Sequence, residues 1–257
     1  MAKYRSPPTA AHKLLDPHMN LFLRSLALVC LGSTLWSLTQ AAGVATPYRP
    51  RPRGMPRITV SGGTRSPDSC LSASGPQLQT LFPEDDMGYT SQPYPTFHWY
   101  MPASQIARVE FYLYQVRDSD NGSEPIYQTV FSPIATGGIA TLPLSPALGI
   151  RPLDAGQPYY WVVEAYCADD FQPSAIADGY VELLPSNSEL TTFLSAPTGP
   201  EAAAMAASRG LWFDTVRLHL EQLRENPDDP VVVSSWQTLL TSVGLDDVAA
   251  AALYVTP

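Results

Sequence analysis

Lysine is nearly missing from this chain of 257 residues, since Lys3 and Lys13 are the only two and every other basic side chain is an arginine. The 15 basic residues face 24 acidic ones, which gives a net charge of −9. Without the first 45 residues, 11 basic and 23 acidic residues would remain, and five of those arginines fall within residues 46–65. The rest of the chain is therefore strongly acidic, which argues against nucleic acid as a partner of the folded part.

Histidine is scarce as well. Only His98 and His219 follow residue 45; the first falls on the polar face of a predicted strand and the second on a charged predicted helix. Neither has nearby the Cys, Asp or Ser residues that define a zinc site or a serine triad. The sequence predicts no catalytic residue, no metal site and no cofactor.

Cysteine occurs three times, and Cys30 lies in the apolar N-terminal segment. The remaining two, Cys70 and Cys167, most simply pair with each other in an exported chain. Such a disulfide would close a loop of about 100 residues, worth up to roughly 4 to 5 kcal/mol if it acts by restricting the unfolded chain.

No apolar run is long enough for an uninterrupted transmembrane helix. Residues 21–38 come closest, but Arg24 leaves about 14 apolar-leaning residues of the ~20 that a span needs. The small residues that follow complete the pattern of a secretory signal. We expect export to the periplasm or cell surface, with cleavage after Ala41 or Ala45 and no stable membrane span afterwards. An uncleaved anchor is the alternative, and Met19 is an alternative start.

Composition divides the chain into four parts. A signal segment covers residues 1–45, and a linker rich in arginine and proline covers residues 46–65. A β-sandwich over residues 66–186 and a helical cap over residues 187–257 follow. Within the linker, residues 46–57 favour polyproline II and leave nothing apolar to bury, so we expect a solvated tether. Weak attraction to anionic polymers or lipid headgroups is the alternative.

Six runs carry the signals of short strands bounded by Pro, Gly, Asn and Asp. They are residues 95–101, 108–116, 125–131, 138–144, 158–167 and 179–184. In the first run, Phe97 and Trp99 alternate with His98, which gives one apolar and one mixed face. Asn121-Gly122 is a strong hairpin signal between the second and third runs. These features predict an antiparallel β-sandwich.

Two local patterns resemble fibronectin type III and immunoglobulin-like domains. Tyr159-x-Trp161 resembles the tyrosine corner of those domains, and Phe97-x-Trp99 resembles their second strand with its buried tryptophan. The resemblance implies an immunoglobulin-like sandwich in which Trp99, Tyr159 and Trp161 have structural roles. Cys70 departs from the usual pattern, because it precedes the second strand.

Four helices are predicted near the C-terminus, after a short one that opens at Ser188. They are residues 200–209, 211–225, 231–243 and 246–253. Gly210 and Gly244, each followed by leucine, lie 34 residues apart, and this part resembles degenerate tetratricopeptide repeats. Two helix pairs are fewer than the ~3 repeats that stand alone. We therefore expect Trp212 and Trp236 to be structural and the helical bundle to pack on the sandwich.

The order of features as a whole resembles a family of secreted cyanobacterial proteins catalogued as a domain of unknown function. The motifs that carry it are YPTFHWYMP, the YYWVVEAYC strand with its cysteine, and NPDDP followed by SVGL. The resemblance covers about residues 66–246. It implies architecture and compartment, but no activity and no catalytic residue.

Acidic clusters are the remaining candidates for chemistry. Residues 118–124 (DSDNGSE) are similar to a calcium loop, but the spacing is one residue short and the late glutamate is misplaced, so an ordinary polar hairpin is favoured. Residues 84–86 and 169–170 could supply the paired carboxylates of a glycosidase, although adjacent acids in loops are usually solvated. A hydrolase of envelope polysaccharide that uses loop carboxylates is therefore the alternative function.

Tyrosines on the mixed faces of the predicted strands offer a surface for binding. Tyr100, Tyr112 and Tyr114 are the candidates, although half of the chain's exposed-looking tyrosines would pack between sheets and under helices. We expect a non-enzymatic exported module, periplasmic or on the cell surface, that recognises protein or envelope glycan.

Overall fold

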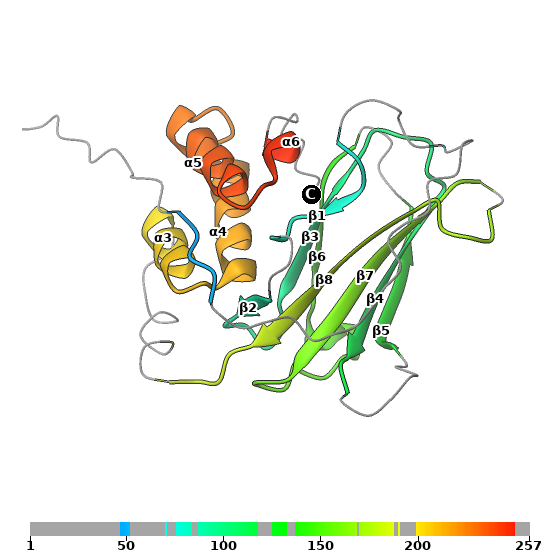
Figure 1. The fold of residues 1–257 in the computed structure, drawn as a ribbon, viewed down its shortest axis with the longest axis horizontal. Coiled ribbons are helices and arrows are strands. Elements are labelled where there is room, and N and C mark those ends of the chain that lie inside the picture. The colour runs from blue at the N-terminus through cyan, green and yellow to red at the C-terminus, as the bar shows by residue number, and fades with distance from the viewer. Residues whose placement is uncertain are drawn as a thin grey trace, which may run out of the picture. The chain divides into compact units, whose positions relative to one another are not determined.

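The computed structural model describes residues 47–51, 70, 76–83, 87–117, 125–132, 137–168, 170–187, 190 and 199–249 (Figure 1). All of them belong to one unit, Gly43–Pro257. The strands are β1 (Gln79–Thr80), β2 (Gly88–Thr90), β3 (Thr96–Met101), β4 (Arg108–Gln115), β5 (Pro125–Phe131), β6 (Gly138–Pro143), β7 (Pro158–Tyr166) and β8 (Ala175–Leu183). The helices are the 3-10 helix η1 (Pro146–Leu148), α3 (Pro200–Ser208), α4 (Trp212–Glu225), α5 (Pro230–Thr241) and α6 (Asp246–Ala249). The predicted signal segment lies outside the described residues.

The strands form two sheets of mostly antiparallel strands. The small sheet has the order β1-β3-β6, and the large sheet has the order β2-β8-β7-β4-β5. Among the pairings of the named strands, β2 with β8 is the parallel one, and an isolated bridge between Ala155 and Leu183 is parallel as well. The six predicted strands are confirmed, and β8 begins four residues earlier than predicted. β1 and β2 were not predicted from the sequence, because two or three residues are too few to display a period of two.

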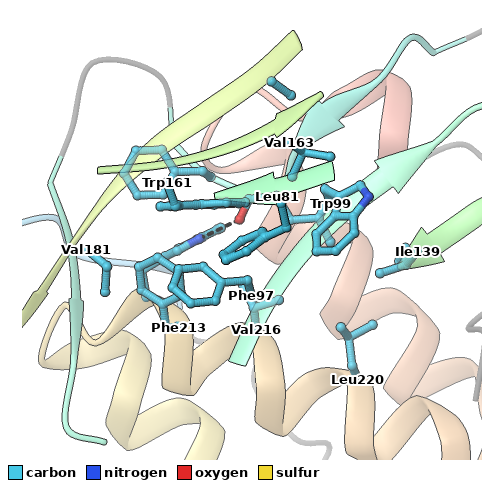
Figure 2. Close-up of a cluster of buried hydrophobic side chains, with 14 of the residues drawn as sticks. Leu81, Phe97, Trp99, Ile139, Trp161, Val163, Val181, Phe213, Val216 and Leu220 are labelled. Carbon is cyan, nitrogen blue, oxygen red and sulfur yellow. Dashed lines mark hydrogen bonds between the residues drawn. The ribbon is translucent and has the colours of Figure 1, made fainter. Parts of the chain in front are cut away.

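Aromatic side chains from both sheets meet in one hydrophobic core, as Figure 2 shows. The ring of Phe97 in β3 lies 5.0 Å from that of Phe111 in β4 and 4.9 Å from that of Trp161 in β7. Trp99 and Trp161, to which the sequence analysis gives structural roles, are 1% and 0% exposed. The inner faces of the two sheets therefore pack against each other.

Phe213 of α4 enters the same core. Its ring centroid lies 5.5 Å from that of Phe97 and 6.3 Å from that of Trp161. Gly88 in β2 permits this approach, because a Cβ atom at that position would lie 2.5 Å from the Phe213 ring. The glycine is thus required by the close contact between the strand and the helix.

The two tryptophans of the C-terminal helices are fully buried. Trp212 donates a hydrogen bond of 2.7 Å from Nε1 to the backbone carbonyl of Leu81, beside the small sheet. Trp236 of α5 belongs to the same core as the aromatic residues of the sheets. Their packing agrees with the expectation that the helices lie against the sheets, since burying these indoles removes a large apolar area from water.

The glycines spaced 34 residues apart end α3 and α5 with the same turn. Gly210 and Gly244 have φ angles of +70° and +78°, which favour glycine. The N–H groups of Leu211 and Leu245 each donate over 3.0 Å to the carbonyl five residues earlier. This is the Schellman arrangement, in which the backbone satisfies the last carbonyls of a helix. The sequence spacing therefore corresponds to a repeated helix-turn geometry.

Tyr48 contradicts the prediction that the tether has nothing apolar to bury, whereas Pro47, Arg49, Pro50 and Arg51 are exposed as predicted and residues 52–57 lie outside the described residues. Tyr48 is 7% exposed, and its ring packs edge-on against Trp212 with 4.8 Å between centroids. The backbone N–H of Arg49 and the Nε of Arg51 donate over 3.1 and 2.8 Å to carbonyls at the C-terminal end of α3. The Pro-Arg pattern hides this packing, because a single tyrosine between prolines has no periodicity that would mark it as buried.

The disulfide between Cys70 and Cys167 is confirmed. The Cα atoms of the two residues lie 5.6 Å apart, within the range that an unstrained disulfide spans. Cys167 follows β7 directly, whereas Cys70 precedes β1 in sequence. The bridge therefore ties the segment before the small sheet to a central strand of the large sheet.

His98 corrects the prediction of a polar strand face. Its side chain is 3% exposed because α4 contacts β3 on that side. Nδ1 lies 3.2 Å from Thr141 Oγ1, to which Arg224 of α4 donates over 3.1 Å. Burial and the positive charges of Arg224 and Arg217 lower the pKa of His98 to about 3. His219 is also buried, and burial lowers its pKa.

Acidification is expected to destabilise the protein through His98. The unfolded chain binds a proton at this residue near pH 6.5, whereas the folded chain does so only near pH 3. Stability that is fully present above pH 6.5 is therefore lost as the pH falls, by about 2 kcal/mol at pH 5. Urea unfolding at pH 7 and at pH 5 measures the loss. His98→Gln should lose less between these two values, and an identical loss in wild type and variant would contradict the prediction.

Candidate functional site

The outer face of the large sheet carries a row of tyrosines. Tyr112 and Tyr114 lie two residues apart on β4, so both point to the same side of the sheet. Strand pairing places Tyr114 opposite Tyr160 on β7 and Tyr160 opposite Tyr180 on β8. Successive ring centroids are 6.1, 6.2 and 5.1 Å apart. We call Tyr112, Tyr114, Tyr160 and Tyr180 the tyrosine row.

The two ends of the tyrosine row differ in exposure. Tyr160 and Tyr180 are 7% and 4% exposed and belong to a second hydrophobic cluster, which also includes Leu190 and side chains of α3. Tyr112 and Tyr114 are only half buried, and their rings are stacked with 19° between planes. The buried end fixes the row on the sheet, and the accessible end offers ring faces to a ligand.

Carboxylates lie beside the accessible end of the row. Glu110 on β4 stands directly opposite Glu164 on β7. The Tyr112 hydroxyl donates to Glu110 Oε2, and the Tyr166 hydroxyl donates to Glu164 Oε2 over 2.5 Å. Each carboxylate thus accepts a hydrogen bond from a phenol two residues along its own strand.

One arginine balances this acidic pair in part. Arg108 Nε lies 2.7 Å from Glu110 Oε1, and its guanidinium sits 4.0 Å from the ring centroid of Tyr166. A cation over an aromatic ring is held by the charge distribution of the ring as well as by the carboxylate. Among the residues that the structure describes, Arg108 is the one counter-charge shown beside the two carboxylates on these neighbouring strands.

The phenols of this face stay protonated. Burial is the largest cause that raises the pKa of Tyr112, followed by its hydrogen bond to Glu110. The pKa of Tyr166 is raised to about 12 by burial and by its hydrogen bond to Glu164. Burial also raises the pKa of Tyr114. Phenols remain hydrogen-bond donors and the glutamates remain acceptors, so the face can exchange hydrogen bonds with a hydroxylated ligand.

The structure brings together two of the three predicted binding residues. Tyr112 and Tyr114 share the tyrosine row, whereas Tyr100 lies on the small sheet, opposite Gln79 and Ile139. The other members of the face were not predicted from the sequence. The alternation of Arg108, Glu110, Tyr112 and Tyr114 in one strand could have shown that these four side chains share a side. No single-sequence pattern shows which residues of β7 and β8 stand opposite them.

Most of the acidic clusters singled out in the sequence cannot be placed. Residues 84–86 and 118–124 lie outside the described residues, as does Asp169, while Asp170 accepts a hydrogen bond of 3.1 Å from Ser174 Oγ. Within the described ranges, no group of three or more His, Cys, Asp or Glu side chains is arranged to hold a metal ion. Glu110 and Glu164 are an acidic pair that strand pairing places side by side on this face.

The chain was compared with known protein families. The family model described as Domain of Unknown Function (DUF928) matches residues 60–253. No curated protein matches the chain in sequence. Across the residues that the structure describes, no helix combines the length and the apolar character that crossing a bilayer requires.

Proposed function

The chain belongs to the DUF928 family, and we propose that it is an exported, non-catalytic module of the cell envelope that binds a neutral glycan on the tyrosine row. The observation that carries the proposal is the stacked pair Tyr112 and Tyr114 beside Glu110 and Glu164 on an open sheet face. A protein partner, which the sequence left open, is the less favoured ligand. The rings and carboxylates match the alternating CH faces and hydroxyls of a sugar.

Each part of the face has a chemical counterpart in a sugar. An aromatic ring covers the apolar CH face of a pyranose and removes that surface from water. A carboxylate accepts hydrogen bonds from sugar hydroxyls, and bonds to a charged acceptor are the stronger kind. Glu110 and Glu164 each already accept one hydrogen bond from a phenol. This bond fixes the orientation of the carboxylate and leaves further lone pairs for a ligand.

The charge of the face selects against anionic polymers. The two glutamates have one arginine beside them, and the exposed Asp178 of β8 adds a further acid to the same sheet. A polymer of uronic acids or phosphates would meet net repulsion here. A neutral polysaccharide would not, so it is the ligand that this face fits.

Tyr112→Ala combined with Tyr114→Ala is expected to weaken glycan binding at least about tenfold, because central aromatic anchors carry most of an interface's binding energy. Mobility in native gels containing a neutral polysaccharide, with a uronic-acid polymer as comparison, measures the change. Tyr100→Ala on the small sheet is the matched control and should leave mobility unaltered. Equal retardation of the double variant and wild type in every neutral polysaccharide would rule out the tyrosine row as the site.

A hydrolase is the second candidate, with the strand residues Glu110 and Glu164 in place of the loop carboxylates expected from the sequence. The two are direct cross-strand neighbours, and the paired carboxylates of a glycosidase must lie close together. Both residues, however, lie on a sheet face and are engaged by phenols and Arg108. Release of reducing ends from a retained polysaccharide, lost in Glu164→Gln, would favour this second function over binding alone.

The finer architecture is also part of the proposal. We infer an immunoglobulin-like sandwich for two reasons. The central strand of the small sheet, β3, contacts β4 and β7 of the large sheet across the core. The Asp154 N–H donates over 2.9 Å to the Tyr159 hydroxyl, as in a tyrosine corner. The repeated turns at Gly210 and Gly244 support a degenerate tetratricopeptide relationship.

Export and a cyanobacterial origin belong to the proposal as well. The disulfide supports export, because such bonds persist in oxidising compartments. The apolar run within residues 21–38, followed by small residues, is the sequence feature of a secretory signal.

A further inference from the structure

The two sheets are closed along one flank and open along the other. On the closed flank, Thr80 Oγ1 of β1 donates over 3.0 Å to the carbonyl of Asp178 in β8. On the open flank, β5 and β6 are each the last strand of their sheet. A cavity of about 350 Å³ lies between these two edge strands. Its volume falls in the range of small-molecule sites.

The cavity wall is apolar and comes from the inner faces of both sheets. The bulky side chains of the wall are Trp99, Met101, Tyr127, Phe131, Leu142 and Leu148. Among the described residues that line it, none carries a charge, and the polar ones are threonines, a serine and the Tyr127 phenol. Tyr127 and Phe131 are only partly buried, although they face inward from β5, because the space beside them is the cavity.

One buried hydrogen-bond donor in this wall has no partner. Trp99 is 1% exposed, and its Nε1 makes no hydrogen bond in the structure. Figure 2 shows this nitrogen on the side of the indole that faces away from Phe97. Trp161 and Trp236 also have unpaired Nε1 atoms, but neither lines the cavity. A buried donor without a partner is costly and calls for an acceptor.

We propose that this cavity binds a neutral lipid-like molecule, with an apolar body between the two sheets and one uncharged oxygen that accepts a hydrogen bond from Trp99 Nε1. The apolar wall favours burial of hydrocarbon, and the unpaired indole sets the place of the acceptor. A carboxylate or phosphate is disfavoured inside, because no lining side chain among those described would compensate its charge.

This site is separate from the tyrosine row. Tyr112 and Tyr114 project from the outer face of the large sheet, whereas Trp99 and Phe131 contact each other at 5.6 Å between ring centroids on the inner side. The proposed glycan site and the proposed lipid-like site are therefore independent, and failure of one proposal would not contradict the other.

The test uses Prodan, a neutral naphthalene ketone whose fluorescence reports an apolar environment. The full chain is titrated into a solution of Prodan. Saturable binding with a blue shift is expected for wild type. Ala140→Phe, which places a ring in the cavity from β6, should weaken binding by more than about tenfold, because the space is filled. Gln128→Phe, on the exposed side of β5, is the matched control and should bind as wild type does.

The hydrogen bond is tested separately. Trp99→Phe keeps an aromatic ring but removes the donor, and it should weaken Prodan binding roughly two- to tenfold. The same variant should bind a propylnaphthalene that lacks the ketone as wild type does, measured by displacement of Prodan. If Trp99→Phe does not fold, preference of the wild type for the ketone over the hydrocarbon gives the same information. Absence of binding to wild type, or unchanged affinity in Ala140→Phe, would overturn the proposal.

Discussion

Trp212→Ala is expected to lower the free energy of unfolding by about 4 to 5 kcal/mol. Removing a buried tryptophan side chain costs about 3 to 5 kcal/mol through lost burial and the cavity left behind. The substitution also leaves the Leu81 carbonyl without its donor and the Tyr48 ring without its neighbour. A protein of ordinary stability would then be close to unfolding at room temperature. Urea unfolding of the full chain measures the change.

The control for this prediction is a second aromatic truncation at an exposed position. Phe171 is 95% exposed, so Phe171→Ala should alter the free energy of unfolding by less than about 0.5 kcal/mol. A small effect of Trp212→Ala, comparable to that of Phe171→Ala, would mean that the C-terminal helices do not contribute to the stability of the sheets. The helices would then form an independent domain, and a role in recognition would become the favoured one for them.

Loss of the disulfide is expected to destabilise the protein by about 2 to 5 kcal/mol. The bridge joins residues 97 positions apart, and freeing a loop of that length returns much conformational entropy to the unfolded chain. Cys70→Ser with Cys167→Ser should therefore shift the urea midpoint downward. Reduced wild type should match the double variant, which separates the effect of the bond from that of the serines.

The state of the same bond in native cells tests export. The intact mass of protein from the native envelope should show a missing N-terminal segment, ending near Ala41 or Ala45, and two hydrogens fewer than the reduced chain. A full-length chain with both thiols free would contradict export and the oxidising compartment together.

The strands and helices could be predicted because their apolar residues recur with the period of a strand or of a helix. Phe97 and Trp99 are buried together as their period of two requires, and α4 begins and ends within one residue of its predicted bounds. The prediction failed at His98, because the polar face of β3 turned out to be covered by α4. A strand's own sequence shows which residues share a face, but not whether another element will cover that face.

The candidate site was only half predictable for a related reason. Tyr112 and Tyr114 share a strand, so their proximity follows from the sequence, whereas Glu164 and Tyr180 join them only through the register of β7 and β8. Register is fixed by the packing of the inner face, which involves residues far away in the chain. The cavity beside Trp99 was not predictable at all, because it arises where two sheet edges fail to meet.

The placement of Tyr48 and Trp212 in one contact has a consequence for how the chain reaches its native state. The Leu81 carbonyl receives its hydrogen bond from an indole 131 positions later, and Tyr48 reaches across 162 positions to Gly210. Contacts of such high sequence separation slow folding, because the chain loses the entropy of closing a long loop before the stabilising contacts form. The sheets therefore complete their core only after the C-terminal helices, α3 to α6, are available to pack against them.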